Sequence, residues 1–141
     1  MSRIKIELAG EFSFQTSIPV RITDVNYGGH VGNDSILSII HEARVQFLSN
    51  FNYNEMDVEG VSLIMSDVAI QFKSELFYGN TIRAHVKAGE FTRAGFVLYY
   101  KLVKQDSNTV IAIATTGMVC FDYSKKKITA VPEKAKQRLL S

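Results

Sequence analysis

The side chains best suited to chemistry lie close together, in residues 24–34. This stretch holds a carboxylate (Asp24), an amide (Asn26) and an imidazole (His30). A carboxylate can orient or deprotonate water, and an imidazole, whose ordinary pKa is near neutrality, can share that task. The amide has two donors and an acceptor, so it could hold the water or a carbonyl group. Asp24, Asn26 and His30 are therefore the candidate catalytic residues, for attack of water on an electrophilic carbon.

The same stretch is also typical of an ordinary turn. Gly28, Gly29 and Gly32 permit unusual backbone angles, and Asp and Asn side chains often bond their own backbone in turns. Without further context, the residue types favour the turn. The pattern alone therefore leaves both a catalytic loop and a plain turn open.

A helix is expected directly after this loop. Asn33, Asp34 and Ser35 are good N-cap residues, and Asp34 is expected to cap the helix. The following positions are apolar on most of the helix circumference: Ile36, Leu37, Ile39, Ile40, Ala43, Val45, Phe47 and Leu48. Such a pattern predicts a buried helix, ending near residues 50–52. Backbone N–H groups around Gly32, Asn33 and Asp34 would face a negative charge in front of the helix, as an oxyanion site requires.

Two polar residues interrupt this apolar helix. Glu42 must be paired or functional, because a carboxylate among apolar side chains is costly. A water-positioning role and an ion pair or interface role both remain open for Glu42. We expect His41 to be a satisfied core or interface histidine, and His85 to be an exposed residue of a strand.

The rest of the chain is rich in strand patterns. Strands are expected over residues 12–22, 62–73, 81–88, 95–104 and 109–122, and a short helix from Pro132. One buried helix can be enclosed by a curved antiparallel sheet. The pattern therefore predicts an α+β fold in which such a sheet wraps around one long central helix. The exposed edges of the sheet would invite pairing with a second subunit.

Composition narrows the class of protein. The 141 residues, 46% of them hydrophobic and 21% charged, fit one domain spanning 1–141. A net charge of +2 is too small to indicate a nucleic-acid partner, and no apolar run is long enough for a membrane span. The N-terminus lacks a signal-peptide pattern, so a cytoplasmic location is expected. The single cysteine, Cys120, is expected to be a small buried hydrophobe, and no metal site is predicted.

The loop and the helix together resemble a known family. Residues 24–33, with the turn Gly29-His30-Val31-Gly32-Asn33, followed by Glu42-Ala43-Arg44, resemble the active-site loop and central helix of hotdog-fold thioesterases. The 4-hydroxybenzoyl-CoA thioesterase-like and acyl-CoA thioesterase groups are the most similar. Tyr78-Gly79-Asn80 and Val131-Pro132-Glu133 resemble further family features, so the resemblance spans roughly residues 16–134.

This resemblance implies a hotdog fold and hydrolysis of an acyl-CoA or acyl-carrier-protein thioester, without a cofactor, in a homodimer or homotetramer. Tyr27, Met65 and Phe72 would contact the substrate, and Phe47, Leu48 and Phe51 would line the acyl pocket or belong to the core. Basic side chains would meet the phosphates of the carrier; the candidates are Arg83, Lys87, Arg93, Lys101 and residues 125–127. The run of lysines at 125–127 is otherwise expected to be a solvated turn.

One position departs from the family pattern. Many relatives place their catalytic aspartate where this chain has Asn26, and Asp24 lies two residues earlier. The Asp24-x-Asn26 pair resembles one found before a histidine in plant acyl-carrier-protein thioesterases, although His30 is farther away here. Two alternatives follow. A hotdog-fold enoyl-CoA hydratase would usually have Asn-Pro-x-His, but Tyr27 stands at the proline position. A non-catalytic acyl-CoA-binding protein would tolerate Asn26.

Overall fold

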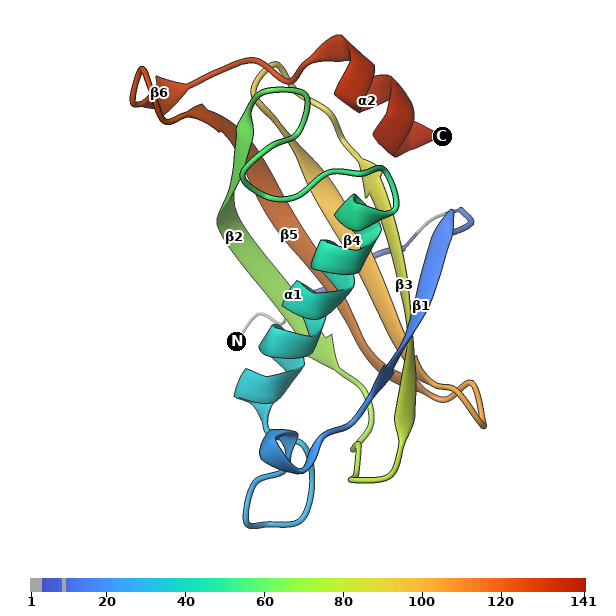
Figure 1. Ribbon diagram of the computed structural model, residues 1–141. Coiled ribbons are helices and arrows are strands. Elements are labelled where there is room, and N and C mark those ends of the chain that lie inside the picture. Colours follow the sequence, from blue (N-terminus) through green and yellow to red (C-terminus); the bar gives the residue numbers. More distant parts are fainter. Residues whose placement is uncertain (1–3, 9) are drawn as a thin grey trace.

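The computed structural model describes residues 4–8 and 10–141. Its elements follow the chain in this order: β1 (Phe14–Pro19), the 3-10 turn η1 (Ile22–Asp24), α1 (Asn33–Ser49), β2 (Ser62–Phe72), β3 (Thr81–Gly89), β4 (Gly95–Lys104), β5 (Val110–Asp122), β6 (Lys127–Ile128) and α2 (Glu133–Leu140). The long helix α1 lies across the hollow side of the sheet, and α2 lies at one end of it (Figure 1).

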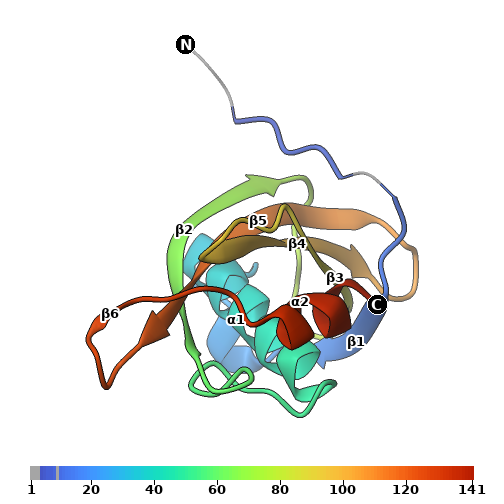
Figure 2. The ribbon, with the colours of Figure 1, turned by 90° about the horizontal axis from the view of Figure 1, so that it is seen from above.

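The sheet is antiparallel and curved. Its strand order is β1-β3-β4-β5-β2, and the short β6 pairs with β5. Seen from above, the strands curl around α1 so that the helix occupies the concave side (Figure 2). This arrangement confirms the predicted α+β fold of a curved antiparallel sheet around one central helix.

The period-2 alternation of β3 explains which side of the sheet is buried. Ile82, Ala84 and Val86 are fully buried against the helix side, while Arg83 and His85 between them belong to the opposite, convex face. β4 and β5 alternate in the same way along most of their length. The sheet therefore presents one apolar face to α1 and one largely polar face outward.

The helix completes the core from the other side. Ile40, Ala43, Phe47 and Leu48 are fully buried, so Phe47 and Leu48 belong to the core. The helix is less enclosed than its composition predicts, because Leu37 is 39% exposed in this single chain. One curved sheet covers only part of a helix circumference, which leaves an outward face with the polar residues Ser38, His41 and Glu42.

Several boundaries differ from the sequence prediction. The first strand is shorter than the predicted 12–22, because the chain bends into η1 after Pro19. The last helix begins at Glu133, with Pro132 as its N-cap, close to the predicted start. Cys120 is buried as predicted, and burial raises the pKa of its thiol to about 11. A thiol in that state is protonated at neutral pH and is a poor nucleophile.

Among the helices of the described residues, none combines the length and apolar character that a membrane crossing needs.

Candidate active site

The loop before α1 folds back on itself in a tight turn. The backbone N–H of Asn26 donates to the carbonyl of His30, and the N–H of Gly29 donates to the carbonyl of Asn26, both at 3.0 Å. Gly29 has a φ of +91°, a left-handed conformation that explains a glycine at this position. The side-chain oxygen of Asn26 accepts a bond from the N–H of Gly28 at 2.9 Å. The segment therefore forms the turn that its residue types favour, and this turn determines where the candidate side chains lie.

The turn brings Asn26 and His30 to the same side. A Cβ built on Gly28 would lie 3.1 Å from Oδ1 of Asn26 and 3.7 Å from Nε2 of His30. Both side chains therefore flank the same glycine. Asn26 and His30 are thus the two members of the predicted catalytic trio that the structure brings close together.

Helix α1 begins beside this pair without a capping side chain. Gly32 is the N-cap, in an extended conformation with φ −74° and ψ 159°, and its N–H donates to the carbonyl of Asp24 at 3.3 Å. The prediction that Asp34 caps the helix is wrong, because this bond fixes Gly32 at the cap and places Asp34 in the first turn. The N–H groups of the first turn are thus not satisfied by a cap, and the positive end of the helix dipole faces outward.

Two polar side chains border this helix start. A Cβ on Gly32 would lie 2.7 Å from Oδ1 of Asp34 and 3.9 Å from Nδ2 of Asn26. The glycine therefore leaves room for the Asp34 carboxylate and keeps the Asn26 amide next to the helix N-terminus. Asn26, Gly32 and Asp34 form one small polar cluster, to which His30 is joined through the turn.

His30 also lines a hollow in the surface. This hollow, of about 270 Å³, lies between the start of α1 and the segment that connects β2 to β3, and Asn33 and Phe72 line it with His30. The backbone of Val31 is attached to the same segment, since its N–H donates to the carbonyl of Leu76 at 2.8 Å. The imidazole is therefore half-buried at the border of a partly apolar hollow.

Asp24 turns away from this cluster. Its carboxylate is 4% exposed and accepts bonds from the backbone N–H of Arg21 at 2.8 Å and from the Arg21 guanidinium at 3.0 Å. The hydrogen bond that the Arg21 guanidinium donates to Asp24, followed by the negative charge of Asp24, raises the pKa of Arg21. The carboxylate that the sequence favoured as a base is thus already paired with a cation.

Glu42 lies with Asp24 in a separate groove. The groove has a volume of about 460 Å³ between β1 and α1, and Arg21 and Gln46 also line it. Glu42 accepts a bond from the Gln46 side chain at 2.6 Å. Across residues 4–8 and 10–141, no hydrogen bond joins the Asp24 or Glu42 side chain to Asn26 or His30. The predicted site residues therefore fall into two sets on different sides of the loop.

The residues predicted to contact the substrate also lie apart from one another. The Tyr27 side chain is fully exposed at the tip of the turn. Phe72 is 50% exposed and lines the His30 hollow. Met65 lies elsewhere along β2, with its sulfur 4.0 Å from the Arg44 guanidinium. Phe72 is the member of this group that the structure places next to the turn cluster.

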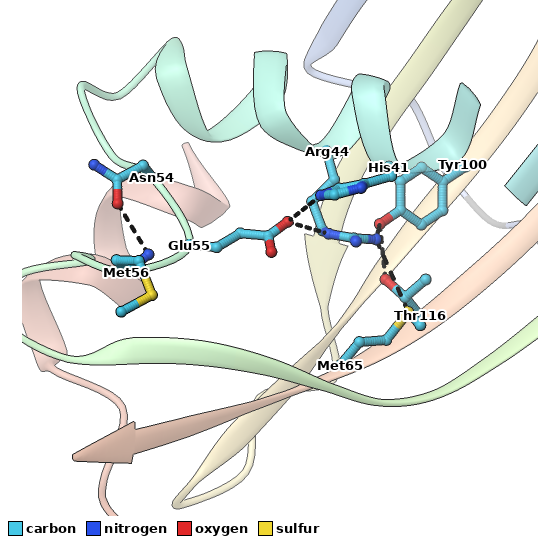
Figure 3. A network of polar contacts seen from close by, with 8 residues as sticks. All are labelled: His41, Arg44, Asn54, Glu55, Met56, Met65, Tyr100 and Thr116. Atoms are coloured by element: carbon cyan, nitrogen blue, oxygen red, sulfur yellow. Dashed lines mark hydrogen bonds and ion pairs between the residues drawn. The ribbon is translucent and has the colours of Figure 1, made fainter. Parts of the chain in front are cut away.

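A buried polar network on α1 was missed by the sequence reasoning, which used Arg44 only as part of a motif. The Arg44 side chain is 7% exposed, and its Nε donates to the Glu55 carboxylate at 2.8 Å (Figure 3). Its Nη1 donates to the Tyr100 hydroxyl at 3.4 Å, and that hydroxyl is 2.7 Å from the Thr116 hydroxyl. His41, predicted as a satisfied histidine, lies 3.3 Å from the same Glu55 oxygen. An arginine within an otherwise apolar helix was the available signal, because a buried cation needs partners.

The turn cluster has the elements that attack on a carbonyl requires. The Asn26 amide can hold a carbonyl oxygen or a water, and the His30 imidazole can accept and return a proton. Uncapped N–H groups at a helix start stabilise a developing negative charge. The groove set, by contrast, holds its carboxylates in existing hydrogen bonds. The turn cluster is therefore the better candidate for chemistry.

Comparison with known proteins gives a consistent result. The family model for the thioesterase-like superfamily matches residues 20–139. The 1,4-dihydroxy-2-naphthoyl-CoA hydrolase of Microcystis aeruginosa is 29% identical over 123 residues, which cover 85% of this chain and 88% of that protein.

Solved structures show the same fold. A 1,4-dihydroxy-2-naphthoyl-CoA thioesterase from Synechocystis superposes with a TM-score of 0.80 at 21% identity, covering 90% of this chain and 94% of that chain. A thioesterase from Thermus thermophilus, solved with coenzyme A and zinc, gives a TM-score of 0.78 at 15% identity, covering 93% and 100%. The hotdog fold is therefore confirmed.

Proposed function

Because this chain belongs to the thioesterase-like superfamily and is thereby a thioester hydrolase, we propose that its substrate is an acyl-CoA thioester whose carbonyl binds at the start of α1. The observation that carries this proposal is the uncapped helix N-terminus at Gly32, with the Asn26 amide beside it. A relative that hydrolyses a CoA thioester supports CoA as the carrier. An acyl-carrier-protein thioester has the same reacting group and is the close alternative.

In the proposed reaction, water attacks the carbonyl carbon while His30 accepts its proton. The carbonyl oxygen becomes an oxyanion, which is stabilised by the backbone N–H groups of Asn33 and Asp34 and by the amide of Asn26. The N–H of Gly32, predicted as a further donor, is already bonded to the carbonyl of Asp24. The C–S bond then breaks, the free acid forms, and the departing thiolate takes the proton from His30. The proposal thus assigns one role each to His30, to Asn26 and to the first-turn N–H groups.

Asp24 has a positioning role in this proposal. Its carboxylate holds the backbone N–H and the guanidinium of Arg21, and its carbonyl accepts the N–H of Gly32. These bonds connect the segment that follows β1 to the N-cap of α1. Asp24 therefore affects the substrate indirectly, because it holds Gly32 in position. Glu42 contributes negative charge to the neighbouring groove.

A second copy of the chain is the proposed partner. β2 is an edge strand, and its apolar side chains Met65, Val68 and Phe72 are 38%, 38% and 50% exposed. A free edge with apolar side chains favours pairing with another strand. Pairing of two β2 edges would cover these side chains and enclose the hollow that His30 and Phe72 line.

The test is a panel of acyl-CoA substrates with a free-thiol readout. We expect thiol release from the unmodified protein, and a fall in kcat/KM of about a hundredfold in Asn26→Ala, the size expected when one oxyanion donor is lost. His30→Ala should lose a similar amount, since a positioned acid–base group contributes a hundredfold or more.

Asn54→Ala is the matched control for Asn26→Ala. Its side-chain oxygen accepts the N–H of Met56 at 2.9 Å, the same kind of turn bond that Asn26 makes with Gly28, but it lies beyond the other end of α1. This control should keep full turnover. Unchanged turnover in Asn26→Ala would refute the proposed site. Tight acyl-CoA binding without thiol release would indicate a binding protein, and loss of an enoyl group without thiol release would indicate a hydratase.

A further inference from the structure

The N-terminal arm crosses the convex face of the sheet, on the side opposite to α1. The backbone N–H of Ile6 donates to the Gln71 side chain of β2 at 3.0 Å. Farther along the arm, the Phe12 ring lies 5.8 Å from the His85 ring of β3. Viewed from above, the arm passes outside the strands while α1 lies inside them (Figure 2). The arm therefore creates a second covered region that the turn cluster does not share.

A hollow of about 450 Å³ lies under this arm. Glu11, Ser13 and Gln15 line it from the arm and β1, and His85 and Lys101 line it from the sheet. Gln15, His85 and Lys101 are directly opposite one another across β1, β3 and β4. Their side chains thus form one row on the convex face, within reach of a single small ligand.

Lys101 and the nearby Arg83 bring positive charge to the row. Lys101 and the neighbouring Arg83 face His85, and across residues 4–8 and 10–141 no carboxylate lies in an ion pair with these three residues. Desolvation, followed by the charges of Lys101 and Arg83, lowers the pKa of His85. The carboxylate among the residues that line the hollow is Glu11, on the arm.

We propose that this hollow binds a phosphate-bearing anion between Lys101 and His85. A phosphate group has several acceptor oxygens, and the hollow offers the Lys101 ammonium, the His85 imidazole, the Gln15 amide and the Ser13 hydroxyl as donors. Like charges on adjacent strands are unfavourable unless an anion lies between them. The site lies on the other face of the sheet from the start of α1, so it does not depend on the proposed hydrolytic function.

The first test is a titration of inorganic phosphate followed by NMR of the His85 imidazole. Bound phosphate should raise the pKa of His85, because a nearby negative charge favours the protonated ring. Lys101→Gln should weaken phosphate binding roughly tenfold, as expected for loss of one charge-assisted hydrogen bond. Lys104→Gln, at the end of the same strand and outside the hollow, is the matched control and should bind phosphate like the unmodified protein.

A second variant tests the direction of the effect. Glu11→Gln removes the carboxylate that lines the hollow and should tighten phosphate binding. Competition by CoA but not by dephospho-CoA would assign the site to the 3′-phosphate of CoA, and equal displacement by both would assign it to the diphosphate that they share. Displacement by neither would assign the site to a different phosphorylated ligand. The inference is overturned if phosphate leaves the His85 titration unchanged, or if Lys101→Gln and Lys104→Gln bind phosphate equally. Asn26→Ala should retain phosphate binding, so failure of the hydrolytic site would be seen separately.

Discussion

The two ends of α1 satisfy their polar groups in opposite ways. At the N-terminal end, Gly32 offers no capping side chain, and the Asn26 amide lies beside N–H groups of the first turn. Toward the C-terminal end, Arg44 is buried and its donors meet Glu55 and Tyr100 (Figure 3). The N-terminal end thus keeps backbone N–H donors available, whereas the side-chain donors of Arg44 are used in hydrogen bonds within the fold.

This difference separates chemistry from stability along one helix. A site that stabilises a developing charge needs donors that are already oriented and not yet occupied. Such donors contribute little to folding, so the helix must be held in place elsewhere. The buried network of Arg44 does this because it joins α1 to the loop containing Glu55 and to β4 through Tyr100. Substitutions at the two ends should therefore affect different measurements.

The largest expected effect is on stability, from Arg44→Met. The substitution removes the cation that Glu55 and Tyr100 share and should lower the free energy of unfolding by about 2–3 kcal/mol. Urea denaturation measures this change. Arg138→Met is the matched control, because that arginine also pairs with a carboxylate, Glu59, but its side chain is 39% exposed. This substitution should lower the free energy of unfolding by about 1 kcal/mol or less. Equal losses in the two variants would contradict the role given to burial.

An intermediate effect, on activity alone, is expected from Gly32→Ala. The new methyl group would lie 2.7 Å from the Asp34 carboxylate, which must rotate away and crowd the start of the helix. We expect kcat/KM to fall about tenfold, while the melting temperature stays within the range of the unmodified protein. Gly89→Ala is the control, since its methyl group would meet only the Tyr99 ring, at 3.2 Å, and Ala should be neutral for turnover there. A melting temperature that falls together with kcat/KM would show that Gly32 serves folding instead.

The smallest effect is expected beyond the C-terminal end of α1, at Glu59. The hydrogen bond from Tyr53, and after it the charges of Lys134 and Arg138, hold the pKa of Glu59 below its ordinary value. A carboxyl group with a lowered pKa in the folded state contributes stability above its ordinary pKa and loses it as the pH falls through the lowered value. Glu59→Gln should therefore lower the melting temperature at neutral pH and flatten its decrease in acid.

The measurement for Glu59 is a series of thermal denaturation curves between neutral and acidic pH. Glu7→Gln, an exposed glutamate on the N-terminal arm, is the control and should follow the unmodified protein throughout. A Glu59→Gln curve parallel to that of the unmodified protein would mean that the contacts of Glu59 with Tyr53 and Arg138 do not stabilise the end of α1.

The sequence predicted the architecture because the relevant signals are local. The alternation of Ile82, Ala84 and Val86 follows from the pleat of a strand, and the apolar run of α1 follows from the need to bury one helix within one sheet. The glycines and asparagines of residues 24–33 predicted the bend before the helix for the same reason, since each acts on its own backbone.

The roles of the polar side chains were decided by the tertiary structure. Asp24 and Asn26 are two positions apart, yet the Asp24 carboxylate pairs with Arg21 while the Asn26 amide borders the start of the helix. Arg44 bonds to Glu55 and Tyr100 on two other segments, and Tyr100 in turn bonds to Thr116 on a third, which no spacing in the sequence could indicate. Backbone conformation depends on neighbours along the chain, whereas the partner of a charged group depends on which distant segments the fold brings within hydrogen-bond distance.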